Sequence, residues 1–278
     1  MEFNPIIIKE LRGRMRGWRA TIVVTVYLLV ISTVMLLFYG GLYNNTFFGS
    51  NTQVGKSLFL PLIIVQVLLL SIITPISTAA AISSERERQT YDVLLTTLLP
   101  ARTIILGKLL AAIAYSLLLM VVTLPLAVLC LLLGGLDISD VLLVNLVLLA
   151  MTFLYGSFGL YASAMMRTTL GATSLALGLV VFLSALLPLF AYLLLFTSGT
   201  GSLSRSTTVF NIVNSISPPF AVSSLLSSNQ LGLFQPWMYF TIIAALASGL
   251  LIWLSVRALR PREGRLSRQQ RVQITRQD

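Results

Sequence analysis

Six stretches of the chain are each apolar over more than about 20 residues, the length that a helix needs to cross the hydrocarbon of a bilayer. None carries an Asp, Glu, Lys or Arg in its central turns. They cover residues 20–43, 57–82, 109–133, 141–165, 170–197 and 236–258. The sequence therefore predicts an all-α integral membrane protein with six transmembrane helices.

The overall composition supports this class of protein. Hydrophobic residues make up 56% of the chain and charged residues only 10%, with a mean hydropathy of +0.91. Soluble domains carry about 25% charged residues, so this chain holds too few to cover a water-exposed surface. Buried core helices of a soluble protein are the alternative for these stretches, but too little polar chain remains to cover six of them.

The basic residues fall almost entirely on one side of the predicted membrane. If the six stretches cross in turn, all but two of the 19 Lys and Arg lie on the side that holds both termini. Only Lys56 and Arg205 lie opposite. Such an excess of Lys and Arg marks the cytoplasmic side. We therefore expect a multi-pass protein of the cell inner (plasma) membrane, with the N and C termini in the cytoplasm.

This distribution also explains the net charge of +10 without a nucleic acid as partner. Each Lys or Arg near the anionic headgroups of the cytoplasmic leaflet gains about 1 kcal/mol. Membrane lipids are therefore the expected partners of the basic clusters, including the C-terminal tail at residues 259–278.

The N-terminal segment, residues 1–19, carries an apolar stripe at helical spacing. The stripe consists of Ile8, Leu11, Met15 and Trp18, and basic residues occupy the other faces. An amphipathic helix of this kind lies in the membrane interface with its apolar face toward the acyl chains. We expect an interfacial helix here; the alternative is an ordinary basic flank of the first span.

The connection between the second and third spans combines charge with an apolar patch. Ser84 and Glu87 have the spacing of a capping box, which predicts the start of a helix. Pro100 ends the helical pattern. The apolar patch between them consists of Tyr91, Leu94, Leu95 and Leu98. A short amphipathic helix at the cytoplasmic surface suits docking to a partner, whereas the alternative is a solvated connecting loop.

Catalysis by this chain is not expected. Histidine is absent and Cys130 is the single cysteine, which excludes Ser-His and Cys-His dyads and four-cysteine zinc sites. The run from Gly49 to Gly55, Lys56 and Ser57 resembles a phosphate-binding loop, but five residues separate the glycines where the motif needs four. We therefore predict no ATPase motif, no metal site and no cofactor-binding site in this chain.

The connection between spans two and three resembles the coupling-helix region of ABC-2 type permeases, the membrane-spanning subunits of ABC transporters. The matching positions are Glu85, Arg86, Glu87, Thr90, Asp92, Leu94, Leu95, Gly107 and Lys108. The opening Asn4-Pro5 resembles the start of the family's interfacial elbow helix, and Ser217-Pro218-Pro219 resembles a motif of its outer loop. This chain departs from the pattern by placing its proline at Pro100, two positions later than the family often has it.

The resemblance implies an architecture and a division of labour. It implies a single transmembrane domain over residues 1–278, a cytoplasmic coupling helix, and a re-entrant outer segment between spans five and six. It also implies two partners, a second permease subunit and a separate ABC ATPase subunit that binds ATP and Mg. The residues expected to couple to that ATPase are Glu85, Arg86, Glu87, Thr90, Asp92, Leu94 and Leu95.

The expected function is therefore that of a permease subunit of an ATP-driven exporter, which forms the translocation pathway as a dimer. Gln66 and Asn145 are polar residues within spans and are candidates for lining that pathway; otherwise they make interhelical hydrogen bonds. The alternative is a non-ABC membrane protein, either an ion-coupled carrier or a membrane scaffold. A carrier would usually show acidic residues within its spans, and the six stretches contain none in their central turns.

Overall fold

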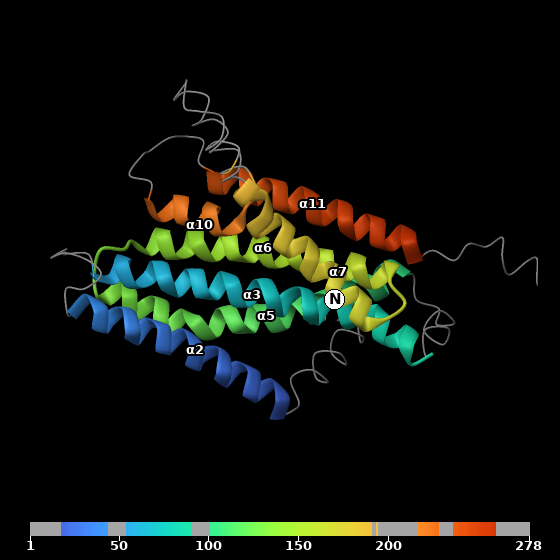
Figure 1. The fold of residues 1–278 in the computed structure, drawn as a ribbon, viewed down its shortest axis with the longest axis horizontal. Helices are drawn as coiled ribbons and strands as arrows, with labels where there is room; N and C mark the ends of the chain where they lie inside the picture. The colour runs from blue at the N-terminus through green and yellow to red at the C-terminus, as the bar shows by residue number, and fades with distance from the viewer. Residues whose placement is uncertain are drawn as a thin grey trace, which may run out of the picture.

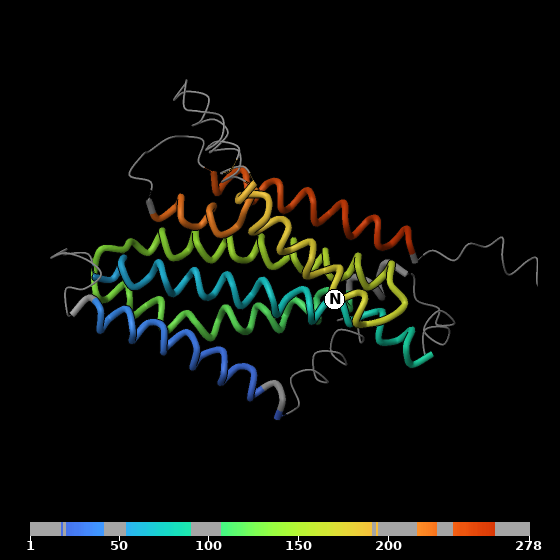
Figure 2. Tube along the Cα trace, viewed as in Figure 1, coloured from blue at the N-terminus to red at the C-terminus, as the bar shows by residue number. Residues whose placement is uncertain are grey.

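All the regular structure in the described residues of the computed structural model is helical. The structure describes residues 18–43, 54–89, 101–190, 193, 216–227 and 236–259. The helices are α2 (Trp18–Tyr43), α3 (Val54–Glu87), α5 (Ala101–Leu132), α6 (Ile138–Met165), α7 (Thr169–Val181), the π-helix η1 (Phe182–Leu186), α10 (Pro218–Ser227) and α11 (Pro236–Leu259). Figure 2 follows the chain through these elements. No strand occurs in the described ranges, which agrees with the all-α class.

Six helical segments are long and apolar enough to cross a membrane, as the sequence predicts. They are Thr21–Gly41, Val54–Glu87, Gly107–Leu132, Ile138–Met165, Thr169–Phe190 and Pro236–Ala258. Helix α5 begins eight residues before the predicted start of the third span at residue 109. Helix α3 continues five residues beyond the predicted end of the second span at residue 82. The reason is tertiary, because the last turns of α3 contact three other helices.

The helices form an elongated bundle with α3 and α6 at its centre (Figure 1). The helices α5, α7 and α11 pack around this pair, and α2 lies against α3 and α5 at the edge. Helix α2 contributes Tyr27 and Ile31 to the hydrophobic core, while most of its other described side chains are exposed or half-buried. Its outward face is the surface that a lipid or another subunit would cover.

The two ends of the bundle carry different residues. One end holds the end of α3 and the starts of α5 and α7, and we call it the Lys108 end. The opposite end holds the start of α3 and the turn between α5 and α6, and we call it the Asp137 end. Helix α10 packs against α11, α6 and α3. In Figure 1 it lies toward the Asp137 end of the bundle.

The helices α3 and α6 approach closely at Gly159. A Cβ atom placed on Gly159 would overlap Thr78 Oγ1 and would lie 2.7 Å from the carbonyl oxygen of Pro75. Small residues permit such contact between membrane helices, which gains dispersion energy over a long interface. Glycine is therefore required at this position by the separation of the two backbones.

The helices α3 and α5 are joined by polar contacts that recur about every two helical turns. The contacts are Gln66 Nε2 to Thr123 Oγ1 at 2.8 Å, Thr74 Oγ1 to Ser116 Oγ at 3.0 Å, and Lys108 Nζ to the Ala81 carbonyl oxygen at 2.7 Å. All three are buried. Such bonds contribute only about 0.6 kcal/mol each. Together they fix the register, because sliding one helix past the other would break all three.

We predict that Gly159→Ala destabilises the chain by about 1–3 kcal/mol, the usual cost of inserting a methyl group into a filled interface. The matched control is Gly249→Ala, since a Cβ atom at Gly249 meets nothing within 4 Å. Thermal unfolding of both variants in the same mild detergent measures the difference. Equal melting temperatures for the two variants would contradict the close approach of α3 and α6.

Candidate functional site

The end of α3 extends beyond what a membrane-spanning helix requires. Its 34 residues correspond to about 51 Å of helix, against a hydrocarbon thickness of about 30 Å. The last turns of α3 reach past the ends of the neighbouring helices in Figure 1. Ser83 and Ser84 donate from their hydroxyl groups back to the carbonyl oxygens of Ala79 and Ala80, which satisfies these side chains within the helix.

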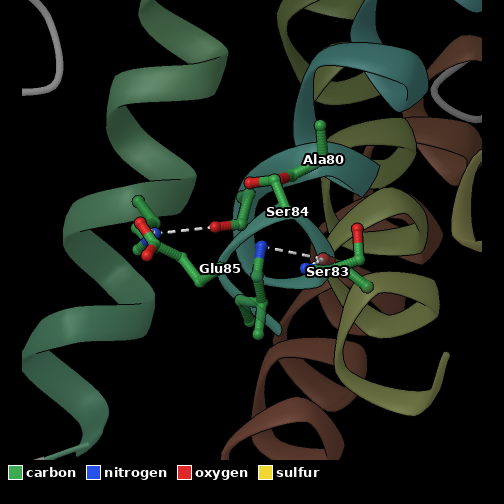
Figure 3. Close-up of polar contacts among 8 residues, drawn as sticks. Ala80, Ser83, Ser84 and Glu85 are labelled. Atoms are coloured by element: carbon green, nitrogen blue, oxygen red, sulfur yellow. Dashed lines mark hydrogen bonds and ion pairs between the residues drawn. The ribbon is translucent and has the colours of Figure 1, made fainter. Parts of the chain in front are cut away.

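Lys108 connects the end of α3 to the start of α5. Its side chain is only 4% exposed, and its Nζ atom lies 3.2 Å from Glu85 Oε1 and 2.7 Å from the carbonyl oxygen of Ala81. A buried ammonium group is costly unless it is paired and hydrogen-bonded, and this one is both. Figure 3 shows Ser83, Ser84 and Glu85 on the last turns of α3, with α5 alongside. The charge of Lys108 thus holds α5 against α3.

Ser163 connects α6 to the same turns of α3. Its hydroxyl oxygen accepts hydrogen bonds from the backbone N–H groups of Ile82 and Ser83, each at 2.9 Å. All three residues are buried. The side chain of Ser163 on α6 therefore binds directly to the backbone of α3.

Glu87 connects α3 to the first residue of α7. Its Oε1 atom accepts from the backbone N–H of Thr169 at 2.8 Å, and its Oε2 atom accepts from the Thr169 hydroxyl group at 2.9 Å. Thr168 caps the same helix by accepting from the N–H of Gly171 at 3.2 Å. A carboxylate is stabilised at a helix N-terminus by the unpaired N–H groups and the helix dipole. Both oxygens of Glu87 are thus used within the chain.

Arg86 reaches the end of α6. Its Nη1 atom donates to the carbonyl oxygen of Met166, the C-cap residue that follows α6, at 3.2 Å. A cation near the carbonyl end of a helix interacts favourably with its dipole. Three consecutive residues, Glu85, Arg86 and Glu87, therefore contact α5, α6 and α7 in turn. We call Glu85, Arg86, Glu87, Lys108, Ser163 and Thr169 the four-helix junction.

The junction contains three of the seven residues that are predicted from the sequence to couple to an ATPase. The other four, Thr90, Asp92, Leu94 and Leu95, lie outside the described residues. The sequence gives no signal for the contact between Glu87 and Thr169, because 82 positions separate them. Ser163 stands out in sequence only as a small residue four positions after Gly159, a spacing that suits helix packing.

The structure describes only some of the other residues and segments that the sequence singles out. Ile8, Leu11 and Met15 of the expected interfacial helix are outside the described residues. Trp18 is the first residue of α2 and is 83% exposed. The expected outer segment, residues 198–235, contains α10, whose first residue is Pro218, a position that favours proline. Its re-entrant path stays a prediction.

The two pathway candidates occupy different environments. Gln66 is buried between α3 and α5, where it makes the hydrogen bond to Thr123 already described. Asn145 is half-buried and donates to the carbonyl oxygen of Val141 on its own helix, at 2.8 Å. Both side chains therefore have a structural partner, and their part in a pathway stays a prediction.

The six long apolar helices are those of a multi-pass membrane protein. A family profile described as ABC-2 family transporter protein matches residues 4–258. Because the match covers most of the chain, the protein belongs to the ABC-2 transporter family. Members of this family are permeases and generally partner with an ATPase subunit. No curated protein matches the chain.

We predict that Glu85→Ala destabilises the protein more than Lys108→Met does. The first variant leaves the buried ammonium group of Lys108 without its carboxylate, which costs about 1–3 kcal/mol. The second leaves Glu85, which is 28% exposed and can be hydrated. Thermal unfolding in detergent compares the two, and the double variant should recover part of the loss. The reverse order would show that the pair does not stabilise the start of α5.

Proposed function

We propose that this chain is the permease subunit of an ATP-driven exporter and works as a dimer with separate cytoplasmic ATPase subunits. The observation that carries the proposal is the four-helix junction at the end of α3, where the segment at residues 88–100 begins. This segment, hereafter the coupling segment, joins the end of α3 to the start of α5, and the four-helix junction lies beside both attachment points. A push on it is therefore directed at α3, α5, α6 and α7 together.

The charges of the described residues support a cytoplasmic location for the Lys108 end. This end carries Arg86, Arg88, Lys108, Arg167 and Arg257, whereas the Asp137 end carries Lys56, Asp137 and Asp140. An excess of Lys and Arg is typical of the cytoplasmic side. ATP is available on that side, so an ATPase subunit docked on the coupling segment would bind and hydrolyse it there with Mg.

The proposal also includes a dimer of permease subunits and transport out of the cell. Large apolar side chains are exposed along α2, α7 and α11, which supports a surface covered by lipid and by a second permease subunit. The exported compound would move along the surface between the two subunits. Export is favoured by analogy with the family.

The proposal predicts that a P-loop ATPase co-purifies with the tagged chain from its native membrane in mild detergent. Asp92→Arg should remove that ATPase, because it reverses a charge in the coupling segment. Asp92 suits this test better than Glu87, whose carboxylate already binds the start of α7. Mass spectrometry of the purified material identifies the partner.

The matched control is Lys56→Glu, a charge reversal at the start of α3 on the Asp137 end. An acidic residue is compatible with the start of a helix, so this variant should keep the fold and the ATPase. If wild-type chain is recovered without an ATPase while other membrane complexes survive, the proposal fails. An ion-coupled carrier or a membrane scaffold would then be the better hypothesis for the function of this chain.

A further inference from the structure

Helix α7 is joined to α3 differently from α5 and α6. The helix α5 is joined to α3 along its length by the three polar contacts, and α6 is joined by the close approach at Gly159 and by Ser163. The polar contact from α3 that reaches the first residue of α7 is made by Glu87. Along the rest of its length, α7 packs against α3 and α6.

The packed face of α7 is lined by small side chains. Its buried residues are Ala172, Ala176 and Val180, and the two alanines cluster with Ala79 of α3 and Ala162 of α6. These small side chains bring the backbone of α7 close to those of α3 and α6.

The fifth span also contains a break in its α-helical pattern. The π-helix η1, Phe182–Leu186, follows directly after α7, and the N–H of Phe182 points to the carbonyl oxygens of both Gly178 and Leu179. Short π-helical turns inside longer helices occur frequently at functional sites and are points where a helix bends. A bend of the fifth span at η1 would change the angle between Thr169–Val181 and the part that follows.

We propose that Glu87 is a positioning residue that transmits displacement of the coupling segment to α7. The carboxylate holds the first residue of α7 at two atoms, so movement of the last turn of α3 pulls the start of α7 with it. The helices α3, α5 and α6 keep their register, and the fifth span bends at η1, which follows α7. This inference rests on the proposed function, because it requires an ATPase that moves the coupling segment.

The test uses the full chain in complex with the ATPase that co-purifies with it, reconstituted in lipid nanodiscs. A single bimane fluorophore is attached at Ser174→Cys, an exposed position on α7, in a Cys130→Ala background. Cys130 is the single cysteine of the chain and is buried in the core. Its replacement leaves the thiol introduced on α7 as the one labelled site of this chain. The shift in bimane emission on trapping the complex with ATP and vanadate reports movement of α7.

Two variants remove the contact from opposite sides. Glu87→Ala deletes the carboxylate. Thr169→Pro deletes the N–H and hydroxyl donors, and proline is well tolerated at the first position of a helix. Thr168, with φ −113° and ψ 145°, already has the extended backbone that precedes proline. We expect both variants to lose most of the emission shift while still binding the ATPase, and Glu87→Gln, which keeps an acceptor oxygen, to retain it.

The matched control is Asp140→Ala, which removes a carboxylate that accepts a backbone N–H at the start of α6 on the Asp137 end. It should leave the shift unchanged. If Glu87→Ala and Thr169→Pro bind the ATPase and show the wild-type shift, or if the wild-type complex itself shows no shift at Ser174→Cys, the role of Glu87 is overturned and the proposed function stands. Failure of the wild-type chain to recover an ATPase overturns the proposed function itself.

Discussion

In a bilayer, no hydrophobic force draws one apolar helix to another, so membrane helices are held together by close packing and buried polar contacts. Helix α3 supplies both kinds of contact in this protein. It meets α6 through Gly159 and Ser163, and it meets α5 through Gln66, Thr74 and the Lys108 contact. The positions of the outer helices follow from this central arrangement.

The six spans could be predicted from sequence because length and hydropathy are local properties of each stretch. The end of α3 could not, because the spacing of Ser84 and Glu87 predicted the start of a helix, and this prediction is wrong. Both residues lie in the last turns of α3, where Glu85 contacts Lys108 and Glu87 contacts Thr169. Contacts between residues about 80 positions apart leave no periodic signal in a single sequence. The family resemblance identified the region, but the contacts of each side chain came from the fold.

The contacts assign a structural role to Glu85, Arg86 and Glu87, the acid-Arg-acid motif of the family resemblance. Each of its three side chains reaches a different helix, so the motif collects α5, α6 and α7 at the end of α3. The motif thus has a structural role within the described part of the chain, at the point where α3 ends.

The limited burial of α2 has a consequence for how the protein is made. Helix α2 is the first described helix to leave the ribosome, yet Tyr27 and Ile31, the two residues that it places in the core, pack against helices that are synthesised later. Helix α2 therefore stays in the bilayer as a single helix until those helices have been inserted. Its surface is apolar on all sides, and a helix of this kind is stable in lipid without a neighbour. Insertion of α2 and its docking are thus separate events in biogenesis.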